Sequence, residues 1–268
     1  MTHKVLLLSG VECEFKELTT YDQELLTKND RKPFSEKLID MLLNAVVKVG
    51  DVRPNAELFK GMLSGDKKKL LTSMRMASLD FAPTFDFDYE YDEDGDTKKY
   101  PLSIPLIKKV VTKVPNPENP DELIDEVTEE VGFSETSYPF QVQNYSEVEA
   151  LKTVFLELPR SKKKARFTLL DGYGEARTEK IKSEDISSST TFIIRDVRTM
   201  EPTDKGEVPI VVRAKDLHIL DGEAIRKAIK ENEGNVDTEV RFEHPVTGKS
   251  VIVDMLQTVA FFFPSQAI

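Results

Sequence analysis

Histidine and cysteine are scarce in this chain, which limits the chemistry that its sequence predicts. The imidazoles are His3, His218 and His244, near the first residue, before an expected helix and after an expected strand. A general base or a metal ligand needs a partner side chain, and no spacing brings these three together. Cys13 is the single cysteine, which excludes a disulfide framework and a cysteine-rich zinc site. The sequence therefore predicts no catalytic residue, no metal and no cofactor.

Two short motifs are similar to ligand-binding loops but lack required residues. In a calcium loop that starts at Asp92, glycine stands sixth and glutamate twelfth, whereas here Gly95 is fourth and Ser103 twelfth. The segment Gly172-Tyr173-Gly174 lacks the third glycine and the basic residue of a phosphate loop. We expect a solvated hairpin tip at the first motif, with an adventitious cation as the alternative, and a turn at the second.

The charge balance argues against nucleic acid and membranes as partners. The chain has 37 basic and 48 acidic side chains, a net charge of −11, which opposes nonspecific binding to anionic surfaces. The lysine runs at 67–69 and 162–164 have no interleaved aromatic residues. No apolar run approaches the ~20 residues of a membrane span, and the apolar start is too short for a secretory signal. We expect synthesis in the cytoplasm without processing.

Hydrophobic periodicity places the expected elements of the first half. Apolar residues over 5–15 predict strand structure, and those from Phe34 to Val49 recur at helical spacing, with Gly50 as the stop. A second helix is expected over 66–79. Alternation from Phe85 to Asp92 and from Tyr100 to Ile104 predicts a hairpin.

A stretch rich in proline separates the two halves. Pro115, Pro117 and Pro120 cannot continue a helix or a central strand. After them, apolar residues from Leu123 to Val131 predict a short amphipathic helix. The second half opens with a strand over 153–158. We therefore expect a first lobe at 1–113, a linker with a short helix at 114–145 and a second lobe at 146–268.

The two halves match each other at a nearly constant offset of 150 to 155 residues, which indicates an internal duplication. The matching landmarks are a strand, an aromatic position, a helix start and a hairpin glycine: Val5–Leu8 with Val154–Leu158, Phe15 with Phe167, Asp66 with Asp221, and Gly95 with Gly248. Chance similarity of apolar positions is the alternative. The fold class expected is α+β, with two related lobes, each a small antiparallel sheet with a helical pair.

Adjacent aromatic residues are the strongest candidates for partner contact. Phe261, Phe262 and Phe263 cannot all face one core from a single strand or helix. Burial within the two-lobed chain and contact with another chain are the two alternatives. Tyr89 and Tyr91, on one face of the expected hairpin, are weaker candidates.

Three segments of the second half resemble a known family. The segments Val240–Gly248, Val251–Asp254 and Phe261–Pro264 are similar to the C-terminal part of tail assembly and baseplate hub proteins of contractile-tailed bacteriophages. Many relatives carry a cysteine-containing knuckle there, whereas this chain has His244 and Thr247, so the resemblance implies no zinc.

The resemblance implies a structural protein of the virion and not an enzyme. We expect a hub or hub-cap subunit of the tail baseplate, which binds other baseplate and hub proteins, the central spike or the tape measure. The alternative within the family is a tail assembly chaperone that is absent from the mature virion. A metal-dependent or hydrolytic enzyme and a regulatory host-binding module are alternatives from other classes.

Overall fold

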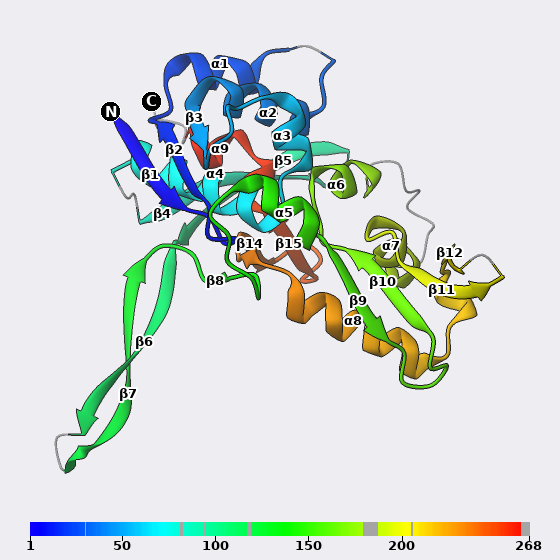
Figure 1. Cartoon of the computed structure of the whole chain (residues 1–268). Coiled ribbons are helices and arrows are strands. Elements are labelled where there is room, and N and C mark those ends of the chain that lie inside the picture. Colours follow the sequence, from blue (N-terminus) through cyan, green and yellow to red (C-terminus); the bar gives the residue numbers. More distant parts are fainter. Residues whose placement is uncertain are drawn as a thin grey trace.

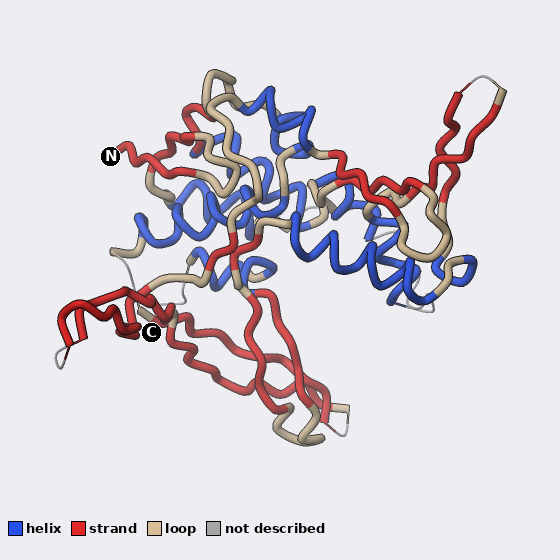
Figure 2. Tube along the Cα trace, turned by 60° about the horizontal axis from the view of Figure 1, so that its bottom comes forward, coloured by secondary structure: helices blue, strands red, loops and turns tan. Residues whose placement is uncertain are grey.

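The protein is mixed α/β, with several small antiparallel sheets. The computed structural model describes residues 1–29, 31–80, 83–93, 95–116, 119–178, 187–204 and 206–263. Within these residues the chain forms nine α-helices and fifteen strands. Figure 2 shows the helices gathered in the centre and strand hairpins extending from them.

The first half combines a three-stranded sheet with four helices (Figure 1). The sheet has the order β1-β2-β3, and all its pairs are antiparallel. Its strands and the helices that follow are β1 (Thr2–Leu6), β2 (Glu12–Lys16), β3 (Val46–Val49), α1 (Thr20–Thr27), α2 (Phe34–Ala45), α3 (Ala56–Gly61) and α4 (Ser64–Ser78).

The helix predicted over 34–49 is shorter than expected. It ends at Ala45, and Val46–Val49 form β3 on the edge of β2. Three of these four residues are valines, whose branched side chains fit a strand better than a helix. The prediction of a helix as far as Val49 was therefore wrong in its last turn.

The predicted hairpin over 85–104 is confirmed. β4 (Thr84–Glu93) pairs with β5 (Asp96–Pro105) in a regular antiparallel register. Gly95 at the tip has a φ of +90°, which favours glycine. Asp94, which belongs to the acidic motif at this tip, lies outside the described residues.

The segment predicted as linker and short helix forms a second, longer hairpin. β6 (Ile107–Asn116) and β7 (Asn119–Val131) pair antiparallel, and Pro115 lies near the tip. The prediction of a helix over 123–131 was therefore wrong. Leu123, Val127 and Val131 are spaced by four, and this spacing places residues on one face of a helix or of a strand alike. We call β6 and β7 the arm, and Figure 1 shows it projecting away from the body.

The second half contains a four-stranded sheet and a second set of helices. The sheet has the order β12-β11-β10-β9. Its elements are α5 (Tyr145–Leu151), β9 (Thr153–Glu157), β10 (Lys164–Thr168), α6 (Gly172–Thr178), α7 (Ser187–Ile194), β11 (Arg198–Thr203), β12 (Gly206–Val211) and α8 (Ile219–Asn232). The remaining strands and the last helix are β8 (Glu135–Thr136), β13 (Asn235–Val236), β14 (Glu239–Glu243), β15 (Ser250–Asp254) and α9 (Val259–Phe262).

One local prediction in the second half was wrong. Gly172 begins α6 and is not part of a simple turn. The carboxylate of Asp171 accepts a hydrogen bond from the Gly174 amide (2.9 Å), so this aspartate caps the helix and allows it to start at a glycine.

One continuous hydrophobic core joins the two halves and the C-terminal segment. α9 lies against β4 and α1 of the first half. Phe133 and Tyr138 of the segment between the halves, and Tyr145 at the start of α5, are buried in the same core. None of the described helices has the length and apolar character that crossing a membrane requires.

Cys13 is expected to be unreactive in the folded protein. Its side chain is fully buried, and burial raises the pKa of its thiol to about 12, with Asp66 and Glu14 adding to the effect. The thiolate is the reactive species, so a disulfide reagent at pH 8 should modify Cys13 about 10³-fold more slowly than in the unfolded chain. A colorimetric thiol assay with and without denaturant measures this difference. T97C, at the exposed tip of β5, is the control and should label at once; equally fast labelling of Cys13 would contradict the prediction.

Candidate functional site

A buried aspartate lies in the first turn of the main helix of each half. In α4, Asp66 accepts a hydrogen bond from the Ser9 amide (2.9 Å) in the β1–β2 turn. In α8, Asp221 accepts hydrogen bonds from the Arg160 amide (2.7 Å) and the Ser161 amide (3.1 Å) in the β9–β10 turn. Each carboxylate therefore ties the start of a helix to the turn of a hairpin.

A second pair of contacts matches in the same way. The Leu18 amide after β2 donates to Ser78 Oγ at the end of α4 (2.7 Å). The Leu170 amide after β10 donates to Glu233 Oε1 after α8 (2.8 Å). The main helix of each half is thus held to its hairpin at both ends.

The pKa values of the two aspartates are shifted in opposite directions. Burial raises the pKa of Asp66 to about 6, although hydrogen bonds from Ser9 and Leu8 partly offset this effect. Its second oxygen, Oδ2, is buried without a hydrogen-bond partner among the described residues. Burial also disfavours the charged form of Asp221, but the hydrogen bonds from Arg160 and Ser161 outweigh it and lower the pKa of Asp221.

These opposite pKa shifts predict opposite pH effects for two matched variants. Because the folded-state pKa of Asp66 is raised, its contribution to stability is full below about pH 4 and is lost as the pH rises through 6. The free energy of unfolding of the wild type should therefore fall relative to D66N by about 3 kcal/mol between pH 3 and pH 7. The contribution of Asp221 is present above its unfolded pKa and is lost on acidification, so D221N should cost more at pH 7 than at pH 3.

Denaturant titrations of the wild type, D66N and D221N across this pH range measure both effects. If the free energy of unfolding depended on pH in the same way in all three proteins, the opposite pKa shifts of Asp66 and Asp221 would be contradicted.

The start of α4 is an interior junction. The amide of Leu63 donates to Tyr145 Oη (2.8 Å) and the amide of Gly65 donates to Tyr138 Oη (3.1 Å). The Ser64 amide donates to the Leu170 carbonyl of the second half (2.8 Å). The two tyrosines and the second half therefore cover the start of this helix.

The start of α8 is more open than the start of α4. His218 caps the helix through Nδ1, which accepts from the Leu220 amide (3.3 Å). A cavity of about 440 Å³ lies beside Asp221, and Ser161 and His218 are among the residues that line it. Ile219 and Leu220 are exposed at this helix start.

The three adjacent phenylalanines lie inside the molecule or at its edge. Phe261 and Phe262 are fully buried, with their rings almost perpendicular, and Phe263 is partly buried against the same core. The rings of Phe85 and Phe133 contact Phe261. Of the two alternatives that the sequence left open, burial within the chain is the one observed for Phe261 and Phe262.

Tyr89 and Tyr91 lie where two hairpins meet. Tyr89 contacts the edge of Phe242 at a centroid distance of 5.0 Å, and both tyrosines contact the ring of His244. All four side chains are half-buried. The structure thus brings the weaker pair of predicted contact residues to an aromatic face between β4 and β14, far from the phenylalanines in sequence.

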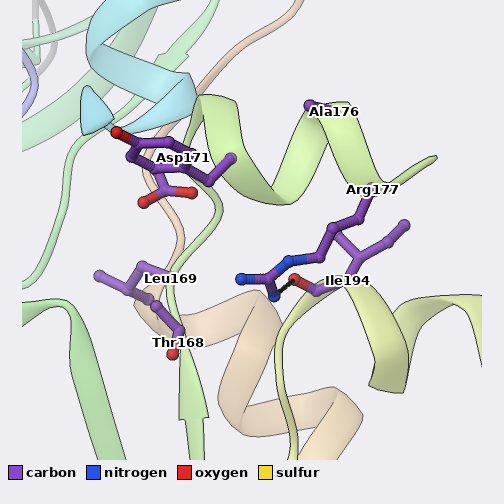
Figure 3. A pocket seen from close by; sticks show the side chains of 7 residues that line it. Thr168, Leu169, Asp171, Ala176, Arg177 and Ile194 are labelled. Atoms are coloured by element: carbon purple, nitrogen blue, oxygen red, sulfur yellow. Dashed lines mark hydrogen bonds between the residues drawn. The ribbon is translucent and has the colours of Figure 1, made fainter. Parts of the chain in front are cut away.

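A pocket of about 360 Å³ lies between the end of β10, α6 and α7 (Figure 3). Its charged groups already hold the protein together: Arg177 donates to the Ile194 carbonyl (3.3 Å), and Asp171 accepts from Lys152 Nζ (3.3 Å). Arg177 and Asp171 therefore connect neighbouring elements of the fold at this pocket.

The three histidines lie on separate elements, as the sequence predicted. His3 Nε2 donates to Glu17 Oε1 (2.9 Å), and its ring stacks on Phe15. His218 caps α8, and His244 contacts the two tyrosines. Across the described ranges, no three His, Cys, Asp or Glu side chains form a group that could hold a metal ion.

The arm is a candidate site that the sequence patterns above do not predict. Six of its described aliphatic side chains have exposed fractions of 38–59%: Ile107, Val111, Leu123, Ile124, Val127 and Val131. The signal that could have found it is the matched length of the segments before and after the prolines, one with lysines and the other with acidic residues.

The arm therefore offers an apolar surface that the described residues leave exposed, whereas the pocket beside α6 and the three histidines make contacts within the fold. No known protein family, curated protein or solved structure matches this chain.

Proposed function

We propose that the chain is a structural subunit of a phage tail baseplate hub, a hub or hub-cap protein that assembles by contact with other hub proteins and the central spike. In this role it acts in the virion and catalyses no reaction. The observation that carries an assembly function is the arm, and the sequence resemblance carries its assignment to the tail.

Main-chain hydrogen bonds join the arm to the body at its base, which leaves the outer part of the arm available for contact with a partner. The Leu106 carbonyl accepts from the Gly132 amide (2.9 Å), and the Leu106 amide donates to the Pro83 carbonyl (2.7 Å). Beyond this base, two strands project from the body with exposed aliphatic side chains. Ordering a projecting hairpin costs conformational entropy, and a two-stranded hairpin buries little apolar surface by itself. Burial of the arm against a partner would offset this cost.

The matching contacts of the two halves support a two-lobed molecule that arose by duplication. Asp66 and Asp221 are 155 residues apart, as are Ser78 and Glu233, and their amide donors are offset by 152. Under this proposal the lobes are pseudo-equivalent and the arm is an insertion between them. Two similar lobes would suit a hub, which presents related surfaces to repeated partners.

Quantitative mass spectrometry of purified phage tails tests the function. A hub subunit should be present at a fixed ratio to the other baseplate proteins in mature particles. Absence from mature particles but presence in tail precursors would replace the hub role by that of an assembly chaperone. Absence from both would overturn the assignment to the tail.

A further inference from the structure

The arm has two open edges of opposite charge. The charged side chains of β6 are Lys108, Lys109 and Lys113, and those described on β7 are Asp125, Glu126, Glu129 and Glu130. Within the described residues, no third strand pairs with either edge. The unpaired amide and carbonyl groups of such edges are templates for another strand.

One face of the arm has apolar rows that alternate with charged rows. Directly opposite residues lie on the same face of an antiparallel pair. The apolar rows are Ile107 with Val131, Val111 with Val127, and Pro115 with Leu123, and the charged rows between them are Lys109 with Glu129 and Lys113 with Asp125. On the opposite face, Lys108 Nζ lies 3.4 Å from Glu130 Oε2.

Pairing of like edges is unfavourable in the registers that align the apolar rows, because those registers oppose like charges. Two β6 edges related by a twofold axis at Val111 would place Lys109 of one copy opposite Lys113 of the other. Two β7 edges related by a twofold axis at Val127 would place Asp125 opposite Glu129. Like charges directly opposite each other destabilise a sheet.

Pairing of unlike edges continues every row. When β7 of one copy lies beside β6 of the next in the register of the arm itself, lysine lies opposite glutamate or aspartate in the charged rows, and the apolar rows extend. The strands remain antiparallel when all arms point the same way. We propose that the arm binds the arm of a second copy of this chain, β6 edge to β7 edge, and that this head-to-tail contact closes into a ring. This inference rests on the proposed assembly function and names its partner.

A head-to-tail contact repeats from copy to copy and closes when the rotation allows. Two copies would give only four strands, whereas about three or four copies give the six to eight strands of a small closed sheet. Closure also needs tilted strands and a stagger in register, and a stagger of four residues between copies still opposes apolar rows with apolar rows and lysines with acidic residues. The ring also removes both open edges, which a lone arm leaves exposed.

Light scattering on size-exclusion fractions of the full chain tests the proposal. The wild type should have at least about three times the monomer mass of 30.4 kDa. The β6 variant K108E/K109E/K113E and the β7 variant D125K/E129K/E130K should each be monomeric, because each places like charges opposite each other in the three rows that pair 108 with 130, 109 with 129 and 113 with 125. An equimolar mixture of the two should form a ring of alternating variants with an even number of copies, and a single chain that carries all six changes should regain the mass of the wild type.

The mixture and the combined variant separate edge pairing from misfolding of the arm. A chain with residues 108–130 replaced by a two-residue turn should be a monomer with Cys13 still protected. A monomeric wild type at about 100 μM, or an oligomer that persists without the arm, would overturn the proposal. A monomeric wild type found in phage tails would overturn self-pairing alone, whereas an oligomer absent from tails and their precursors would overturn the tail function alone.

Discussion

Replacing Gly65 by alanine is expected to lower the free energy of unfolding by about 3 kcal/mol. A Cβ at this position would lie 2.4 Å from the Gly234 carbonyl oxygen and 2.7 Å from Tyr138 Oη. The first is a main-chain atom and the second belongs to a buried ring. The start of α4 would therefore have to move away from the second half. Chemical denaturation followed by circular dichroism measures the loss.

Gly222 provides the matched control because it lies in the first turn of α8. A Cβ there meets only the flexible guanidinium of Arg226, at 3.7 Å. G222A should stabilise the protein by about 0.5–1 kcal/mol, since alanine restricts the unfolded chain and favours the helix. Equal effects of G65A and G222A would contradict the close contact between α4 and the second half.

Replacing Arg75 by alanine is expected to cost about 3–5 kcal/mol. Its side chain is buried in α4, where Nε donates to the Phe261 carbonyl (2.8 Å) and Nη2 donates to the Thr84 carbonyl (2.8 Å). The guanidinium also lies 5.0 Å from the centre of the Phe261 ring. R75A would leave these two carbonyls without these donors and open a cavity, so α9 should detach first. Thermal unfolding and hydrogen exchange at Phe261 measure both effects.

Lys230 is the control for Arg75 because it occupies the corresponding position of α8, 155 residues later, and is exposed. K230A should change the free energy of unfolding by less than about 0.5 kcal/mol. If R75A were as mild as K230A, the guanidinium would not hold the C-terminal segment to the first half.

Sequence periodicity predicted the elements that carry one strong and unambiguous pattern. Alternation over 85–104 predicted the β4–β5 hairpin, and the apolar stripe from Leu70 to Met74 predicted α4. The match between Asp66 and Asp221 also anticipated two similar helix starts, since a carboxylate in a first turn is a common cap. These features depend on local preferences that a sequence contains.

Other features depend on pairing that local sequence does not specify. The spacing by four from Leu123 to Val131 fits either a helix or a strand, and the lysines of β6 opposite the acidic residues of β7 decide for a hairpin. Val46–Val49 likewise leave the helical pattern because the edge of β2 is available. The burial of Phe261 depends on Arg75, 186 residues away, which no local pattern predicts.

Of the residues that the sequence predicts to contact a partner, Tyr89 and Tyr91 lie on the aromatic face between β4 and β14 and are partly accessible. Tyr89 and Tyr91 are half-buried beside His244, so a partner could cover them together. Their role as contact residues remains a prediction, as do the boundaries of the two lobes at 113 and 146.

A density map of an assembled phage tail tip tests most directly whether this chain is a baseplate hub subunit that works through its arm. The account predicts that the chain lies at the tail axis, with β6 and β7 buried against strands of neighbouring subunits. A complete tail-tip map in which no density fits this chain would contradict it, and so would a map in which the chain is present with its arm in solvent.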